Sequence, residues 1–144
     1  MAECVFCEIV AGSRPASVVH RDEQCWAFMD IRPVNPGHVL VVPVEHASGL
    51  SDLDPEIGAQ MFRVAQKVAR ALRVSGLRCE GVNLHLADGQ AAGQEVFHVH
   101  LHVLPRYRGD GFGLRFGPDY GRLAARTELD AIANSLQAAL LSGR

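Results

Sequence analysis

The sequence predicts an α+β fold in which an antiparallel sheet of five strands packs with one long helix and a C-terminal helix. Its strand-like and helix-like segments follow the order strands, helix, strands, helix. That order leaves few of the parallel crossovers that a doubly wound fold requires. The chain has 144 residues, of which 48% are hydrophobic and 21% charged, so it is long enough to bury a core. We therefore expect a single domain over residues 1–144.

Five short segments rich in β-branched and aromatic residues are bounded by turn residues, which is typical of strands. The predicted strands are residues 18–20, 25–29, 39–42, 82–86 and 96–104. A polar turn joins the first two, and a Gly-rich loop separates the last two.

The long helix is predicted between Asp54, a good N-cap, and Gly76, a plausible stop, with Pro55 at the first helical position. One apolar stripe runs along it, formed by Ile57, Met61, Val64, Val68 and Leu72. This stripe should cover one face of the sheet. A final helix should begin near Thr127, with Asp130 in an approximate capping box. Its stripe is Leu129, Ile132, Leu136 and Leu140.

Composition excludes several functional classes. A formal net charge of −2 provides no basic surface for long nucleic acid. No apolar run approaches the roughly 20 residues that span a bilayer, and the N-terminus does not resemble a signal peptide. Four cysteines without an export signal indicate thiols in a reducing compartment. We therefore expect a cytoplasmic protein that acts on a small molecule.

The stretch FHVHLHVLPR, residues 97–106, places a histidine at every second position. On a strand, Phe97, Val99, Leu101 and Val103 would line one face, and His98, His100 and His102 the other. His98 and His102 would then lie roughly 13 Å apart, too far to share one zinc ion with bonds of about 2.1 Å. The imidazoles should therefore have separate roles. Neutral imidazole is a good nucleophile for phosphorus, and the central His100 is the best candidate.

The motif HVHLHVLPR is similar to the His-x-His-x-His pattern of the histidine triad (HIT) superfamily. The segments CVFCEIVAGSRPAS, AFMDIRPVNPGHVLVVPVEH and ADGQAAGQEVFHVHLHVLPRYRGDGFG resemble bacterial HIT hydrolases in the same order. The resemblance implies a nucleotidyl hydrolase or transferase acting on the α-phosphate of a purine nucleotide derivative. A nucleoside phosphoramidate or a dinucleoside polyphosphate would be the substrate. His100 would form a nucleotidyl-histidine intermediate, and His102 would contact the phosphate.

The resemblance also implies a set of nucleotide-binding residues. Asp30 would accept from the ribose hydroxyls with Ile31 beside it, and Gln94 belongs to the phosphate-side loop. The residues around the base would be Val5, Phe6, Ile9 and Phe28. Phe6 and Phe28 can equally be core residues. Many relatives carry an amide where this chain has Ala87, and some carry serine where it has Glu95, and either difference can change substrate choice.

Cys4 and Cys7 form a Cys-x-x-Cys pair that could be redox-active, metal-binding or inert. A zinc site would need two further ligands, for which His38, His46 and His98 are candidates. The resemblance to bacterial members implies the set Cys4, Cys7, His46 and His98. Four protein ligands would make this zinc structural. His38 would then be a buried hydrogen-bonding partner near the triad.

The resemblance further implies a homodimer formed through the long helix and an adjoining strand, with the sheet extended across both copies. Two other functional hypotheses remain open from the sequence. One is a nucleotide-binding regulatory module with little catalysis, and the other is a hydrolase that uses a catalytic zinc.

Overall fold

The structure is a computed structural model that describes residues 3–143. The chain divides into two compact units, the first ending at Phe112 and the second beginning at Gly113. The first contains the sheet and two helices, and the second contains one helix. Each unit is described by itself.

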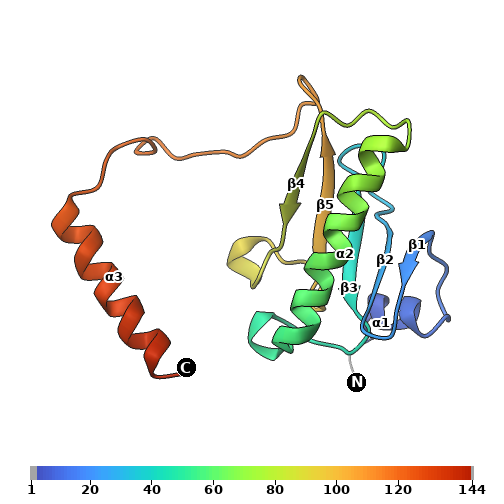
Figure 1. Cartoon of the computed structure of the whole chain (residues 1–144), viewed down its shortest axis with the longest axis horizontal. Helices are drawn as coiled ribbons and strands as arrows, with labels where there is room; N and C mark the ends of the chain where they lie inside the picture. The colour runs from blue at the N-terminus through green and yellow to red at the C-terminus, as the bar shows by residue number, and fades with distance from the viewer. Residues whose placement is uncertain (1–2, 144) are drawn as a thin grey trace. The chain divides into compact units, whose positions relative to one another are not determined.

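The first unit is built on a five-stranded antiparallel sheet with the strand order β1-β2-β3-β5-β4, as Figure 1 shows. The strands are β1 (Val18–Arg21), β2 (Cys25–Met29), β3 (Val39–Pro43), β4 (Gly81–His85) and β5 (Leu101–Arg106). The predicted fold class and number of strands are thus confirmed.

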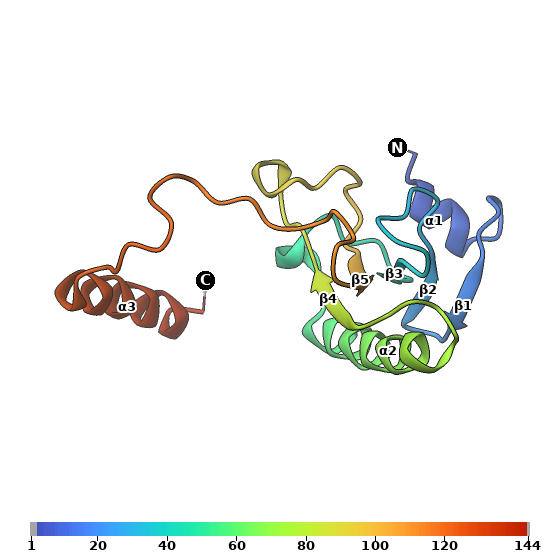
Figure 2. The same cartoon turned by 90° about the horizontal axis from the view of Figure 1, so that it is seen from above.

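Helix α2 (Pro55–Val74) covers one face of this sheet, which is clearest from above (Figure 2). Asp54 caps it by accepting from the Glu56 N–H at 2.8 Å, as predicted. Successive strand residues point to opposite faces, and on the α2 side the buried core includes Ala27, Val41, Val103, Met61 and Val64.

The opposite face of the sheet is partly covered by α1 (Val5–Val10), a helix that the sequence analysis did not predict. Phe6 and Ile9 of α1 pack against Phe28, Leu40 and Val42 of the sheet. A helix of six residues is too short for apolar periodicity to be visible. Its formation depends on this packing and on the Cys4 sulfur, which accepts from the Cys7 N–H at 3.5 Å.

The predicted strand over residues 96–104 is wrong in its first half, because β5 begins only at Leu101. Pro43 ends β3 and has no N–H to donate, and its carbonyl accepts from the His98 ring at 2.8 Å. The Val99 N–H does not pair with a strand and instead donates to the carbonyl oxygen of Ala47, in the loop after β3, at 2.8 Å. Phe97, predicted on the core face, is consequently 51% exposed.

Two single-turn 3-10 helices lie in the connections, η1 (Leu50–Asp52) and η2 (Gln90–Ala92). The second unit contains α3 (Arg126–Leu141), close to the predicted start. The predicted capping box is wrong, because the N-cap is Ala125 and no side chain caps the helix. No helix within residues 3–143 has the length and apolarity needed to cross a membrane.

Candidate active site and metal centre

Four potential metal ligands lie close together where the start of α1 meets the segment before β5. The donor atoms of Cys4, Cys7, His46 and His98 all lie within 4.8 Å of one another. Nδ1 of His98 lies 3.3 Å from the Cys4 sulfur and 3.1 Å from Nδ1 of His46. The Cys7 sulfur lies 3.4 Å from Nδ1 of His46. A tetrahedral Zn²⁺ with ordinary Zn–S and Zn–N bonds places its ligand atoms about 3.3–3.8 Å apart, so the set fits this ion.

His98 is oriented for metal ligation by its second ring nitrogen. Nε2 lies 2.8 Å from the Pro43 carbonyl oxygen, which can only accept, so Nε2 carries the proton. The unprotonated Nδ1 then faces the two sulfur atoms. A hydrogen bond from the other nitrogen to a carbonyl is the usual support of a histidine ligand.

The two cysteines of this cluster also affect the ionisation of Cys7. Burial, together with the adjacent Cys4 thiol, raises the pKa of Cys7. The Cys7 thiol is therefore hard to ionise beside Cys4 alone, and a divalent ion at this position would supply the positive charge that favours the thiolates.

Next to this cluster, a pocket of about 740 Å³ lies over the sheet face that α1 partly covers. This volume is in the range of small-molecule sites. The candidate residues that line it are Val5, Phe6, Ile9, Phe28, Asp30, Ile31, His100 and His102. Gln94 is the only predicted nucleotide-binding residue that does not line it.

His100 has one ring nitrogen occupied and one free. Nδ1 lies 2.8 Å from the main-chain oxygen of His98. Because a carbonyl oxygen only accepts, Nδ1 carries the proton and Nε2 has a free lone pair. Only 8% of the His100 surface is exposed. The Phe6 ring packs edge-on against the His100 ring, with 5.1 Å between their centroids. His100 thus has the tautomer that nucleophilic attack needs.

His102 has the opposite tautomer because of His38. The Val34 N–H donates to Nδ1 of His38 at 3.1 Å, so Nε2 of His38 carries the proton. That nitrogen lies 2.8 Å from Nδ1 of His102. Nδ1 of His102 therefore accepts, and its Nε2–H remains available to donate. His38 is only 3% exposed, as predicted for a buried partner of the triad.

Burial is the main reason that the pKa values of these two imidazoles are low. It lowers the pKa of His102 to about 4, with further contributions from His100 and His38. Burial also lowers the pKa of His38, against the opposing effect of Asp30, whose carboxylate lies 3.5 Å from Nε2. Both rings are neutral at pH 7.

Asp30 and Ile31 lie at the mouth of the pocket. The Asp30 Oδ1 accepts from the Arg32 N–H at 2.8 Å, which orients the carboxylate. Ile31 is 89% exposed and also lines the pocket. Phe6 and Phe28 are both core residues and pocket residues, with ring centroids 5.5 Å apart.

Gln94 shapes the loop before the triad and is only 4% exposed. Its oxygen accepts from the Gly89 N–H at 2.8 Å, and its Nε2 donates to the Ser48 and Val96 carbonyl oxygens at 2.8 and 3.1 Å. Its amide oxygen and its amide nitrogen thus both bond to main-chain groups of the protein. The neighbours that line the pocket are Gly93 and Glu95.

Among the pocket residues that the sequence analysis missed are two rings near the triad, His85 and Phe112. His85 lies opposite His102 in the β4–β5 register, with ring centroids 5.6 Å apart. Strand pairing is needed to find this neighbour. Phe112 follows the triad by ten residues and carries no motif of its own.

A second group of potential ligands, His20, Asp22 and Cys25, is explained by hydrogen bonds of the β1–β2 turn. The Asp22 carboxylate accepts from the His20 ring at 2.6 Å and from the main-chain N–H groups of Gln24 and Cys25 at 2.7 and 2.8 Å. Burial raises the pKa of Cys25 to about 12, so this thiol is a poor ligand.

Comparison with known proteins identifies the family. The model of the HIT domain matches residues 11–109, more than half of the chain. The chain belongs to the HIT family. The motif that gives the family its name contains His100 and His102, two of the histidines that line the pocket.

Several known members of the HIT family are similar to this chain. A HIT family protein of Bacillus anthracis has 37% sequence identity and a TM-score of 0.86, covering 94% of this chain and 96% of its own. A Zn-bound histidine triad family protein of Mycobacterium smegmatis has 43% identity and a TM-score of 0.74, covering 98% and 97%. The adenylylsulfatase HINT3 of Arabidopsis thaliana is 33% identical over 75% of this chain and 54% of its own length.

Proposed function

We propose that this HIT protein is a nucleotidyl hydrolase, or transferase, that cleaves purine nucleotide derivatives at the α-phosphate. The observation that carries the proposal is the tautomer of His100, whose Nδ1–H bonds to the His98 carbonyl and leaves Nε2 unprotonated beside the pocket. Family membership and the activity in the name of the plant relative support the same reaction class.

In the first step, the lone pair of His100 Nε2 attacks phosphorus, and the bond from phosphorus to the leaving group breaks. The leaving atom takes a proton from the solvent as it departs. The nucleotidyl group remains attached to Nε2. His102, which presents Nε2–H, donates to a phosphate oxygen and stabilises the charge that develops there.

In the second step, the oxygen of water attacks phosphorus and the bond to Nε2 breaks. The nucleoside monophosphate is released, and His100 is restored. The attacking water releases one proton to the solvent, which balances the proton that the leaving group took up in the first step. Water therefore supplies hydroxyl to phosphorus and one proton to the leaving group.

The nucleotide would occupy the part of the pocket next to α1. Val5, Phe6, Ile9 and Phe28 would contact the purine, and Asp30 would accept from the ribose hydroxyls. A carboxylate suits a vicinal diol, and aromatic faces suit a flat base. Ile31 would cover the base from its exposed position, and Gln94 would act by shaping the phosphate-side loop.

Zn²⁺ held by Cys4, Cys7, His46 and His98 would be structural, because four protein ligands leave no position for water or substrate. Such an ion would connect α1, with its base-contacting residues, to the segment that carries His100. We also propose cytoplasmic action and a homodimer through α2 and β4. β4 is an edge strand whose Leu84 is 39% exposed, and light scattering tests this assembly.

Replacement of His100 by alanine tests the proposal. The variant should release no AMP from adenosine 5′-phosphoramidate, although it still binds AMP in calorimetry. A brief reaction of the wild type with labelled substrate, quenched by denaturation, should leave nucleotide on the protein. Near-normal turnover by His100→Ala would contradict the assignment. Nucleotide binding without turnover by the wild type would instead favour a regulatory module.

A further inference from the structure

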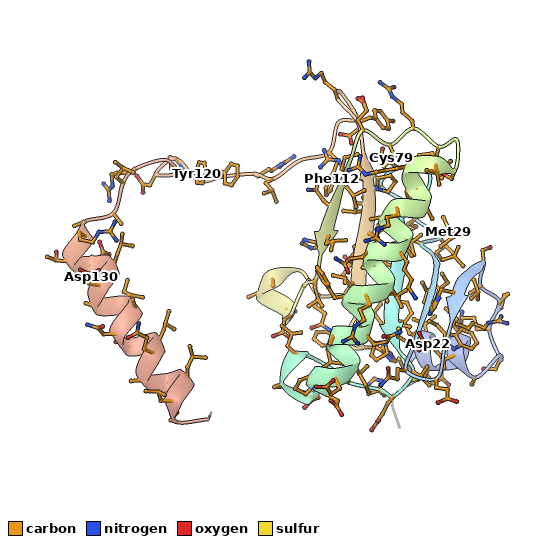
Figure 3. The ribbon with its side chains drawn as sticks, viewed as in Figure 1. Asp22, Met29, Cys79, Phe112, Tyr120 and Asp130 are labelled. Atoms are coloured by element: carbon orange, nitrogen blue, oxygen red, sulfur yellow. The ribbon has the colours of Figure 1, made fainter. Side chains whose placement is uncertain are left out.

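An aromatic residue lies in the pocket on the far side of the histidines from α1. Phe112 lines the same pocket as His100 and His102 and is labelled near the end of the sheet where β5 ends (Figure 3). We propose that Phe112 contacts the leaving group of the substrate, and that Arg106 and Asp110 are the positioning residues that hold Phe112 there. This inference rests on the proposed function.

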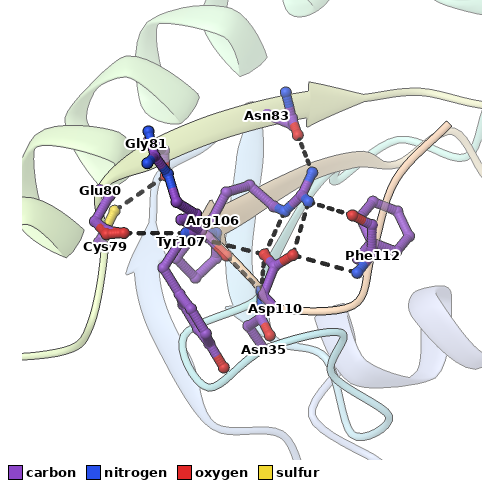
Figure 4. Close-up of polar contacts among 11 residues, drawn as sticks. Asn35, Cys79, Glu80, Gly81, Asn83, Arg106, Tyr107, Asp110 and Phe112 are labelled. Carbon is purple, nitrogen blue, oxygen red and sulfur yellow. Dashed lines mark hydrogen bonds and ion pairs between the residues drawn. The ribbon is translucent and has the colours of Figure 1, made fainter.

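The position of Phe112 is set by a two-point ion pair between Arg106 and Asp110, shown in Figure 4. The distances are 2.6 Å from Nε to Oδ2 and 2.9 Å from Nη2 to Oδ1. The Asp110 side chain is only 3% exposed, and the Arg106 guanidinium holds the pKa of that carboxyl well below its usual range. Paired bonds of this kind fix geometry as well as contributing energy.

Both main-chain polar atoms of Phe112 bond to this pair. Its N–H donates to Oδ1 of Asp110 at 3.2 Å, and its carbonyl oxygen accepts from Nη2 of Arg106. The guanidinium carbon of Arg106 also lies 4.8 Å from the centroid of the Phe112 ring. Main chain and ring are thus oriented by the same two residues.

Two asparagines attach the pair to the sheet. Nη1 of Arg106 donates to Oδ1 of Asn83 on β4 at 2.6 Å. The Asn35 amide donates to Oδ2 of Asp110 and to the Pro105 carbonyl oxygen, both at 2.9 Å. Phe112 is therefore part of a rigid arrangement that spans β5 and β4.

The strand order places this arrangement opposite the proposed base site. Phe28 is on β2 and Asn83 on β4, three strands apart, which corresponds to roughly 14 Å across the sheet. His102 lies between them on β5. A nucleotide with its base against Phe28 and its phosphorus at His100 would direct its leaving group toward Phe112. The Phe112 ring is 42% exposed and so has a free surface for an apolar or aromatic group.

Two substrates that differ only in the leaving group test the inference. One is adenosine 5′-phosphoramidate, which releases ammonia, and the other is its N-benzyl derivative, which releases benzylamine. Phe112→Ala should raise KM for the benzyl compound about five-fold, the size expected for one lost aromatic contact. Its kcat should change less than about two-fold, and KM for the unsubstituted compound should stay within about two-fold of the wild type.

Further variants separate contact from positioning. Phe112→Tyr should retain the wild-type KM for the benzyl compound, because it keeps the ring. Asp110→Asn and Arg106→Lys should raise that KM as Phe112→Ala does, since each breaks the two-point pair. Their melting temperatures are recorded so that unfolding is recognised. Tyr120→Ala is the matched aromatic control, because Tyr120 is 70% exposed, belongs to the second unit and does not line the pocket, and it should change neither KM.

An unchanged KM for the benzyl compound in Phe112→Ala would overturn the inference. An equal rise for both compounds would also overturn it, because Phe112 would then contact the nucleotide. If the wild type cleaves neither compound, the proposed function fails. In that case, the Kd of each compound for wild type and for Phe112→Ala is measured by calorimetry. A higher Kd for the benzyl compound alone in Phe112→Ala would support the contact, and an unchanged Kd would overturn it.

Discussion

Nε2 of His38 lies 2.8 Å from Nδ1 of His102, and this contact determines which nitrogen of His102 carries the proton. The two residues are 64 positions apart in the chain. His38 itself is oriented by the Val34 N–H. A main-chain group thus sets the hydrogen-bonding direction of a side chain in the pocket through one intervening imidazole.

Removing the side-chain donor at position 38 should reduce catalysis while leaving the nucleophile in place. In His38→Leu, Nδ1 of His102 loses its partner, so the ring can turn or change tautomer. We expect kcat to fall by at least about ten-fold, less than the roughly 100-fold or more lost with one donor that stabilises a developing charge, because His102 itself is retained. His38→Gln keeps an N–H donor and should recover part of the loss. Steady-state kinetics with adenosine 5′-phosphoramidate measures kcat for the two variants. Equal kcat values for His38→Leu and the wild type would show that the contact between His38 and His102 has no role in catalysis.

Stability should fall in mild acid because of His102. Its pKa is about 4 in the folded protein, against an ordinary value of 6.5. Between these values the unfolded chain binds a proton that the folded chain does not, so the free energy of unfolding decreases as the pH falls from about 6.5 to about 4. Urea titrations at several pH values should show a shallower decrease for His102→Gln. An identical slope in the two proteins would contradict this.

Metal removal should weaken the fold together with the activity. If Zn²⁺ at Cys4, Cys7, His46 and His98 is structural, a strong chelator should lower the melting temperature by about 10 °C, as expected for loss of a tightly bound ligand. Cys7→Ser should have the same effect without chelator, and metal analysis should show its zinc content reduced. Cys79→Ser is the matched control, since Cys79 lies outside the metal cluster and its thiol donates to the Gly81 carbonyl oxygen. Loss of activity at unchanged melting temperature would instead indicate a catalytic metal.

Glu95 should disfavour substrates with several phosphates. It lines the pocket on the phosphate-side loop, and its negative charge repels a polyphosphate leaving group. Glu95→Ser should lower KM for a diadenosine polyphosphate by about five-fold in low salt, and by less in high salt because of screening. Glu23→Ser, an exposed change outside the pocket, is the control. A KM that does not respond to Glu95→Ser would exclude charge as the selecting factor.

Much of the fold follows from local patterns along the chain. The stripe that includes Met61 and Val64, together with the Asp54 cap, predicts α2 because helix formation there depends on neighbouring residues. The apolar run at Val39 predicts β3 for the same reason. The alternating imidazoles indicate the segment to which we assign the proposed chemistry, and the Cys-x-x-Cys pair indicates a possible metal site.

The first half of the predicted strand fails because Pro43 and Ala47 redirect the backbone of His98 and Val99. These partners lie about fifty residues earlier in the chain, and no local pattern reveals them. Helix α1 was missed because six residues show no periodicity, and its stability comes from contact with Phe28 and Leu40.

Residue identity alone therefore places His100 and His102 two positions apart, predicts a nucleophile at His100, and predicts a long amphipathic helix that covers a sheet. Only the folded chain decides which ring nitrogen of each is protonated, because the deciding groups are the His98 carbonyl and the His38 ring. It also decides that Phe112 meets the pocket, through a salt bridge anchored on two strands. Side-chain direction and protonation depend on contacts between distant segments, and such contacts exist only after those segments pair.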